Sequence, residues 1–201
     1  MPASPNTDAI VSHSPLRHLP NALTVLRILL VLPLVWLIRE RRYDGAVVVA
    51  LIAGLTDALD GWLAKHFGWQ SWIGGIIDPI ADKLMLIGCF ISLGLVGAHP
   101  EWLTWLVVGR DVLIVAGAVA YHYLIGRISG EPTWLSKINT CVQIVYVVMQ
   151  LISLTTWIEL PHALITFGIY LTAAMAVLSG IQYVVIWSVR AAHATRRETT
   201  R

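Results

Sequence analysis

Charged residues are scarce in this chain, making up 13% of its 201 residues, whereas hydrophobic residues make up 57%. Average globular domains carry about 25% charged residues, so this composition is a poor match to a water-soluble fold. The formal net charge is only +2, and lysine and arginine are scattered, which argues against nucleic acid as a partner. The composition therefore predicts an integral membrane protein, with anionic lipid as its neighbour.

Cysteine is rarer still, with only Cys89 and Cys141 present. Their spacing does not match a metal site. Both lie in apolar stretches, where a cysteine behaves as a small hydrophobic residue. We therefore predict that both side chains are buried.

The first twenty residues lack a targeting pattern. They are polar, rich in serine and proline, and contain Arg17 as their one arginine. A transit peptide needs an Arg-rich amphipathic pattern, and a signal peptide needs a basic segment before an apolar core. We predict a mobile tail over 1–14, a membrane domain over 15–189 and a basic cytoplasmic tail over 190–201.

Six apolar segments are separated by short polar breaks. Crossing a bilayer takes about 20 apolar residues, and a backbone in lipid satisfies its hydrogen bonds by forming a helix. The sequence thus predicts an all-α, polytopic membrane protein with six transmembrane helices. They lie near residues 21–39, 44–65, 72–97, 101–125, 134–156 and 162–189.

An even number of crossings places both termini on one side of the membrane. Loops 97–100 and 158–162 on the opposite side carry no lysine or arginine, although the short loop after Arg39 does. By the positive-inside rule, the side of the termini is cytoplasmic. The basic residues on that side are Arg17, Lys65, Arg127, Lys137, Arg190, Arg196, Arg197 and Arg201.

Four aspartates fall within the stretch "DALDGWLAKHFGWQSWIGGIIDPIADK". A carboxylate deep in a crossing costs roughly 2.5 to 3.5 kcal/mol on insertion scales, so these need water, cations or basic partners. Asp57 and Asp60 share one helical face, and Asp78 and Asp82 are one turn apart on the next helix. Because the link at 66–71 is short, we expect the four carboxylates to converge. An all-oxygen set of this kind suits Mg²⁺ or Mn²⁺, and two such ions would balance the charge.

Small residues accompany these acids at Gly61, Ala64 and Gly74. They leave the helix surface bare, which suits either close helix packing in the membrane or the approach of a ligand. With the acids and the nearby Lys65, the second interpretation predicts a phosphate or pyrophosphate site.

These positions resemble the signature of the CDP-alcohol phosphatidyltransferases, D-x-x-D-G-x-x-A-R-x8-G-x-x-x-D-x-x-x-D. The chain matches seven of its eight fixed positions, and the departure is Lys65 in place of arginine. Lysine keeps the charge but loses the bidentate fork that grips phosphate. The matching positions are Asp57, Asp60, Gly61, Ala64, Gly74, Asp78 and Asp82.

Flanking segments are similar to one branch of this family, the cardiolipin synthases of the eukaryotic and actinobacterial type. These segments are "LPNALTVLRILLVLPLV", "GRDVLIVAG" and "EPTWLSKINTCVQ". The phosphatidylglycerophosphate synthases instead carry a second arginine in the fourth helix. Here Arg110 and Asp111 are followed by "VLIVAGAVAYHY", which has no such arginine.

The resemblance implies a role for each matching residue. Asp57, Asp60 and Asp78 would bind two divalent metal ions that hold the CDP-diacylglycerol pyrophosphate, and Asp82 would bind metal or act as the general base. The implied CDP-diacylglycerol-binding residues are Asn21, Thr24, Gly61, Ala64, Lys65 and Gly74. The implied acceptor-binding residues are Arg27, Arg110 and Lys137.

The implied reaction transfers the phosphatidyl group from CDP-diacylglycerol to phosphatidylglycerol and gives cardiolipin and CMP. Synthesis of phosphatidylglycerophosphate from glycerol 3-phosphate is the alternative acceptor chemistry. The resemblance also implies a homodimer, and we expect it in a bacterial inner membrane with its active site towards the cytoplasm.

A divalent-cation transporter is the alternative from another class, because intramembrane carboxylates also mark ion pathways. A transporter predicts acids through the membrane depth. After Asp111 the only acids are Glu131, Glu159 and Glu198, which lie in predicted loops or the tail. This distribution favours the enzyme.

Overall fold

The fold is a set of six helices in chain order, seen in a computed structural model that describes residues 19–67, 72–124 and 133–199. No strand occurs within these ranges. The helices are α1 (Leu19–Arg39), α2 (Tyr43–Phe67), α3 (Trp72–Leu95), α4 (Glu101–Leu124), α5 (Trp134–Ser153) and α6 (His162–Thr199).

The six predicted apolar segments correspond to these helices, with small differences at most ends. The largest difference is α6, which continues to Thr199 and so includes nearly all of the segment predicted as a basic tail. The predicted mobile tail at 1–14 lies outside the described residues. The all-α prediction is confirmed for the part of the chain that the structure covers.

Within the described residues, four helices are long and apolar enough to cross a bilayer, over Ala22–Arg39, Glu101–Tyr121, Trp134–Ser153 and His162–Val189. The other two, α2 and α3, have 25 and 24 residues, a length of about 36 Å at 1.5 Å per residue. Their side chains are described only in part. The helices together make this a multi-pass membrane protein.

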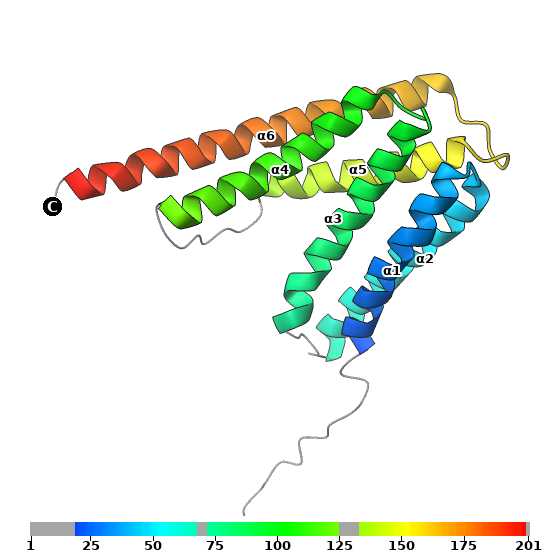
Figure 1. The fold of residues 1–201 in the computed structure, drawn as a ribbon, viewed down its shortest axis with the longest axis horizontal. Coiled ribbons are helices and arrows are strands. Elements are labelled where there is room, and N and C mark those ends of the chain that lie inside the picture. Colours follow the sequence, from blue (N-terminus) through cyan, green and yellow to red (C-terminus); the bar gives the residue numbers. More distant parts are fainter. Residues whose placement is uncertain (1–18, 68–71, 125–132, 200–201) are drawn as a thin grey trace, which may run out of the picture.

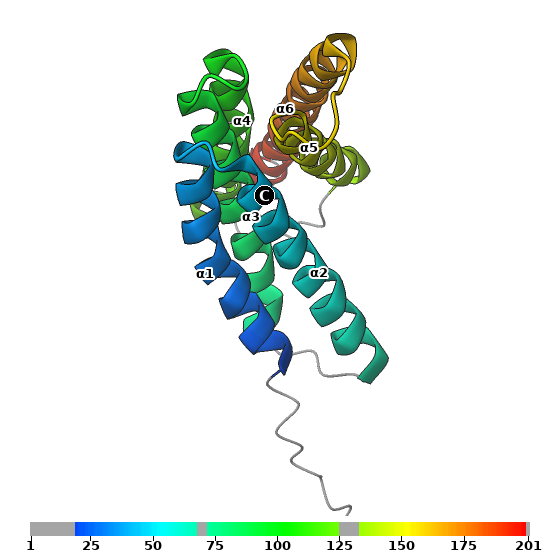
Figure 2. The same cartoon turned by 90° about the vertical axis from the view of Figure 1, so that its right-hand side faces the viewer.

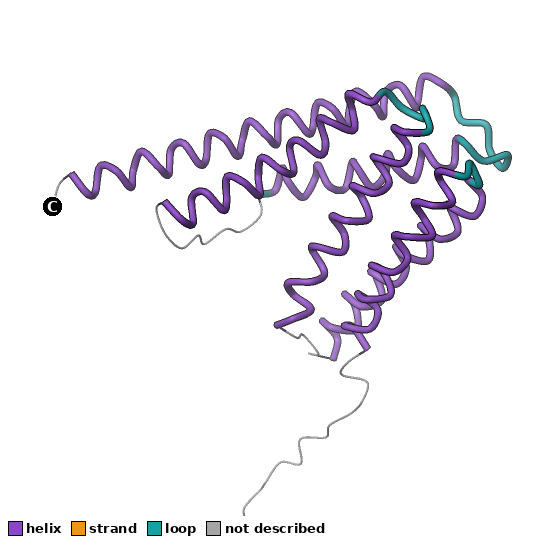
Figure 3. The backbone as a smooth tube through the Cα atoms, viewed as in Figure 1, coloured by secondary structure: helices purple, strands orange, loops and turns teal. Residues whose placement is uncertain are grey.

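The helices form two arms that diverge from a shared end (Figure 1). Helices α1, α2 and α3 pack together in one arm, and α4, α5 and α6 make the other. The connections at 40–42, 96–100 and 154–161 lie near one another at the shared end, where Figure 3 draws them in teal. Figure 2 looks at the molecule from this shared end, with α1 and α2 running downwards and α5 and α6 foreshortened above them. Successive helices thus run in alternating directions.

A hydrophobic core joins the arms at the shared end. Phe90 of α3 stacks on Tyr146 of α5, with ring centroids 5.9 Å apart. Cys89 is buried in this core, as predicted. The prediction for Cys141 is wrong, because this residue lies on an exposed face of α5. The main core side chains are Leu34, Ile38, Ala46, Val47, Leu86, Phe90, Leu93, Leu103, Val107, Tyr146, Val147 and Leu151.

The α3–α4 connection is fixed by a glycine turn. Gly97 adopts φ +73°, a left-handed conformation that glycine takes without strain. The Ala98 N–H then donates to the Leu93 carbonyl at 2.9 Å, and the Gly97 N–H donates to the Gly94 carbonyl at 3.0 Å. This pair of bonds is the Schellman arrangement that ends many helices. Gln150 of α5 donates to the Ala98 carbonyl at 2.8 Å, which ties the turn to the other arm.

His99 in this turn is buried in its neutral form. Its Nε2 lies 2.8 Å from the Thr104 hydroxyl. That hydroxyl donates its own proton to the Phe90 carbonyl at 3.0 Å, so Nε2 carries the hydrogen that it donates to Thr104. A second proton on Nδ1 would be buried without a described acceptor. Burial accordingly lowers the pKa of His99 from 6.5 to about 4.

We expect acid to destabilise the fold through His99. Between pH 6.5 and about 4 the unfolded chain binds a proton at this histidine and the folded chain does not. Stability from the neutral histidine is therefore fully present above pH 6.5 and is lost as the pH falls through this window. Thermal unfolding of the detergent-solubilised protein should show a lower midpoint at pH 5 than at pH 7.5.

The variant His99→Gln keeps hydrogen-bonding capacity without titrating, so its midpoint should change less between the two pH values. His162→Gln is the matched control, since His162 is exposed at the start of α6 on the same end of the molecule. An equal pH response in wild type and His99→Gln would contradict this role.

Candidate active site

Arg27 joins the three helices of the first arm. Its Nη2 lies 2.7 Å from Asp57 Oδ1 on α2, and its Nη1 lies 2.7 Å from Asp82 Oδ1 on α3. The Arg27 side chain is 0% exposed, whereas those of Asp57 and Asp82 are 49% and 44% exposed. An arginine inside a crossing needs an acidic partner, and this one has two. One guanidinium thus holds two carboxylates side by side while both still reach the surface.

These carboxylates suit a hard divalent cation. Each is a pair of oxygen donors, and oxygen ligands are what Mg²⁺ and Mn²⁺ bind in proteins. Asp60 and Asp78 lie on the same two helices, but their side chains are outside the described set. Among the side chains that are described, no group of three or more potential metal ligands occurs. The predicted convergence is therefore visible for Asp57 and Asp82.

Two residues predicted to bind the nucleotide, Thr24 and Gly61, lie one helical turn from the residues of this cluster. Thr24 lies one turn before Arg27 on α1 and is buried. Gly61 lies one turn after Asp57, and a Cβ built there would meet no described atom within 4 Å. No described side chain therefore blocks the approach of a ligand to the α2 backbone at Gly61. The remaining predicted nucleotide-site residues are Asn21, Ala64, Lys65 and Gly74, whose side chains lie outside the description.

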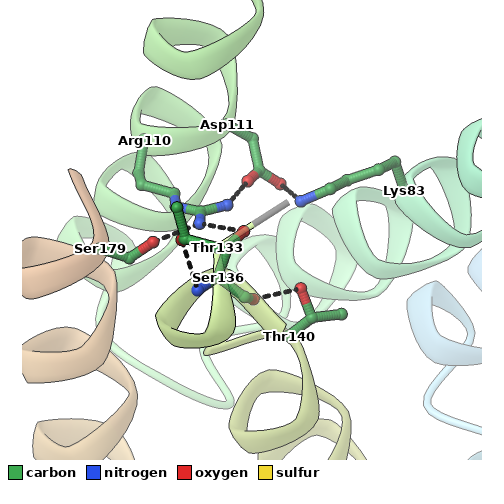
Figure 4. Close-up of polar contacts among 7 residues, drawn as sticks. All are labelled: Lys83, Arg110, Asp111, Thr133, Ser136, Thr140 and Ser179. Atoms are coloured by element: carbon green, nitrogen blue, oxygen red, sulfur yellow. Dashed lines mark hydrogen bonds and ion pairs between the residues drawn. The ribbon is translucent and has the colours of Figure 1, made fainter. Parts of the chain in front are cut away.

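A second polar cluster connects the two arms (Figure 4). Asp111 of α4 accepts from Arg110 Nη1 at 2.6 Å and from Lys83 Nζ of α3 at 2.6 Å. Arg110 Nη2 also donates to Ser136 of α5 at 2.9 Å and to Ser179 of α6. The cluster therefore draws one side chain or more from α3, α4, α5 and α6.

The two predicted acceptor-site cations of the second arm lie in different environments. Arg110 has a side chain that is 4% exposed, and it also faces the Tyr183 ring, 5.8 Å from the centroid. Lys137 is exposed, with Nζ 5.4 Å from the centroid of the Trp134 ring. No described contact joins Lys137 to Arg110.

Lys83 and its pairing with Asp111 were missed at the level of sequence. Lys83 directly follows Asp82, the last position of the family signature, and so lies just outside the matched pattern. A signal was available, because a lysine in an apolar helix needs a partner and Asp111 is the acid next to Arg110 in the following helix. Ser136 and Ser179 gave no such signal, since serine is common between packed membrane helices.

Comparison with known proteins gives relatives of two kinds. The chain is 35% identical over 151 residues to the CMP-forming cardiolipin synthase of Rattus norvegicus, covering 66% of this chain and 49% of that protein. It is 31% identical over 182 residues to a probable cardiolipin synthase (CMP-forming) of Drosophila melanogaster, covering 83% and 56%. It is also 29% identical over 188 residues to a probable phosphatidylglycerophosphate synthase of Mycobacterium tuberculosis, covering 90% and 87%.

Two further facts describe how much of each chain these comparisons cover. The chain spans about half the length of the cardiolipin synthases it matches. A family model described as CDP-alcohol phosphatidyltransferase matches residues 17–188, from just before α1 to near the end of α6. The chain therefore belongs to the CDP-alcohol phosphatidyltransferase family.

Proposed function

We propose that this protein transfers the phosphatidyl group from CDP-diacylglycerol to an alcohol and releases CMP, as a step of phospholipid biosynthesis. Family membership supports the reaction class. The observation that carries the site assignment is the single guanidinium of Arg27 holding Asp57 and Asp82 within 2.7 Å. The rat, fly and Mycobacterium tuberculosis relatives are named as synthases, which favours this reaction over the transporter alternative.

In the proposed step, the acceptor hydroxyl attacks the phosphorus that bears diacylglycerol. A new oxygen–phosphorus bond forms, the bond from that phosphorus to the CMP oxygen breaks, and CMP leaves with the electron pair. Asp82 would take the hydroxyl proton, because a partly exposed carboxylate can reach both substrate and water. Arg27 would keep this carboxylate in place beside Asp57 throughout.

Divalent metal is the cofactor of this proposal, and Asp57, Asp60, Asp78 and Asp82 are the residues that would hold it, as two ions of Mg²⁺ or Mn²⁺. Bound metal would supply Lewis-acid stabilisation of the pyrophosphate charge. The chain's own contribution is to position carboxylates on α2 and α3. Lys65 would add a positive charge for the nucleotide phosphates, and Gly61, Ala64 and Gly74 would leave room for the nucleotide, with Asn21 and Thr24 closing over it.

Phosphatidylglycerol is the acceptor that we propose, with cardiolipin as product. The rat relative is named as a cardiolipin synthase and the fly relative as a probable one. Beyond Asp111, α4 carries valine and leucine side chains that are exposed, such as Val112, Leu113 and Val115. This apolar surface suits an acceptor that brings its own acyl chains. Glycerol 3-phosphate is the second candidate, favoured by the Mycobacterium tuberculosis relative, whose match covers nearly the whole of both chains.

We propose that the chain crosses the bilayer six times. The alternating helix directions place the three connections at 40–42, 96–100 and 154–161 at one end, which supports both termini lying on the other side. The basic residues of the sequence favour the cytoplasm for that side. We propose a homodimer in a bacterial inner membrane, with residues 15–189 as its membrane domain.

The test is to supply purified protein with labelled CDP-diacylglycerol, Mn²⁺ and one acceptor at a time, and to identify the lipid formed by mass spectrometry. We expect cardiolipin from phosphatidylglycerol, at a rate at least tenfold above any phosphatidylglycerophosphate made from glycerol 3-phosphate. Phosphatidylglycerophosphate as the main product would favour the second candidate. The absence of CMP release with either acceptor would refute the phosphatidyl transfer itself.

A further inference from the structure

Asp82 and Lys83 are consecutive on α3 but form ion pairs with different arms of the molecule. Asp82 pairs with Arg27 of α1, inside the first arm. Lys83 pairs with Asp111 of α4, across to the second arm. Consecutive helical residues project about 100° apart, since a turn takes 3.6 residues. The proposed general base is therefore adjacent to a cation at the junction of the two arms.

The two cations of the cluster differ in how far they are open to a ligand. Both Nη atoms of Arg110 already donate, to Asp111, Ser136 and Ser179, and its Nε is buried without a described partner. Because the Arg110 side chain is only 4% exposed, a phosphate could reach it only if the side chains that cover it moved. An ammonium has three N–H donors. Lys83 uses one of them on Asp111 and is 38% exposed.

We propose that Lys83 binds the phosphate of the acceptor, and that Arg110 and Asp111 are positioning residues that hold it in place. This inference rests on the proposed function and changes which cation touches the acceptor. In both acceptor candidates, three carbons of glycerol separate the phosphate from the attacking hydroxyl. A phosphate on Lys83 would thus leave the hydroxyl within reach of the neighbouring carboxylate of Asp82.

The charge of the cluster points to the class of phosphate. Lys83 and Arg110 are two cations and Asp111 is one anion, so the group carries a net charge of +1. A phosphodiester such as phosphatidylglycerol carries one negative charge, which this group balances. Glycerol 3-phosphate is a phosphomonoester with a second ionisation near pH 6, and as a dianion it would leave one charge unbalanced. Asp111 therefore favours a diester acceptor.

The experiment measures KM for each substrate in mixed micelles containing CDP-diacylglycerol, phosphatidylglycerol and Mn²⁺. Lys83→Met keeps the apolar stem of the side chain and removes its charge. Asp111 still has Arg110 as its partner in this variant, so no buried charge is left alone. We expect KM for phosphatidylglycerol to rise about 10- to 100-fold, the effect of losing one charge-assisted hydrogen bond, while KM for CDP-diacylglycerol stays within threefold.

Lys83→Arg, which keeps the charge, should restore most of the acceptor affinity. Arg39→Gln is the matched control, because Arg39 is an exposed cation at the far end of α1, and it should leave both KM values unchanged. The thermal midpoint of each variant shows whether it is folded. If Lys83→Met does not fold, Lys83→Gln replaces it, with a polar amide that can still hydrogen-bond Asp111.

Asp111→Asn tests the charge argument with an isosteric change that raises the cluster charge by one. The ratio of glycerol 3-phosphate use to phosphatidylglycerol use should rise about tenfold or more. An unchanged ratio would overturn the role of Asp111 in acceptor choice. The assignment of Lys83 would be overturned if wild type releases CMP normally and Lys83→Met raises only KM for CDP-diacylglycerol, or raises neither KM. Wild-type protein inactive with both acceptors would instead mean that the proposed function has failed.

Discussion

Replacing Asp57 with Asn is expected to lower kcat by roughly 100- to 1000-fold, the usual cost of removing one group that stabilises transition-state charge. The protein should remain folded, because the Asp57 side chain is 49% exposed and the Asn oxygen can still accept from Arg27. Release of labelled CMP at saturating CDP-diacylglycerol and Mn²⁺ measures the loss. Excess chelator should abolish wild-type activity, and added Mg²⁺ or Mn²⁺ should restore it.

Asp44→Asn is the matched control on the same helix. Asp44 is exposed in the first turn of α2, at the end of the molecule away from Asp57. A carboxylate in a first turn interacts favourably with the helix dipole, an effect of about 0.3 to 1 kcal/mol on stability, and its removal should leave kcat unchanged. Activity above one tenth of wild type in Asp57→Asn, or full turnover in chelator, would refute the assignment of Asp57 as a metal ligand.

The helices were predictable because lipid leaves the backbone few choices. Each apolar run had to form a helix to satisfy its own hydrogen bonds, so composition alone located α1 to α5 to within a few residues. The end of α6 was less predictable. Beyond residue 189 the sequence becomes polar and basic, which indicates where the membrane ends and does not indicate where a helix ends.

The carboxylate pair was also within reach of sequence reasoning. Helical spacing placed Asp57 and Asp82 on faces that could meet, and an arginine in an apolar helix demanded an acidic partner. The structure supplies that partner twice. The sequence did not indicate that one guanidinium would bridge both acids, because this depends on the relative rotation of α1, α2 and α3.

The cluster around Asp111 was only partly predictable for the same reason: the sequence indicated that Lys83 needs an acidic partner, but it did not indicate how the cluster is arranged. Lys83 and Asp111 are 28 residues apart, and their pairing depends on how the two arms meet. Hydrophobic periodicity locates a buried face, but lipid and a neighbouring helix are equally apolar. Cys141 shows the consequence, since its apolar surroundings in the sequence turned out to be an exposed helix face.

Replacing Arg27 should have the other large effect on activity. A lysine keeps the positive charge, but its single nitrogen cannot hold both Asp57 Oδ1 and Asp82 Oδ1 in their present geometry. We expect Arg27→Lys to lower activity about 10- to 100-fold, the range found for residues that orient metal ligands. Arg27→Met should lose more activity and some stability. The stability loss should stay below the roughly 3 to 5 kcal/mol of a fully buried broken pair, since both acids reach the surface.

Kinetics of Arg27→Lys separate two roles for this residue. If Arg27 bound the acceptor's phosphate, a lysine would keep much of that attraction and the main change would be in KM for the acceptor. Because Arg27 instead holds the two carboxylates, kcat should fall and the metal concentration for half-maximal activity should rise, with KM for phosphatidylglycerol unchanged. Arg39→Lys, at the exposed end of the same helix, should alter none of these values. A change in acceptor KM alone would return Arg27 to the acceptor site and leave another group to align Asp57 with Asp82.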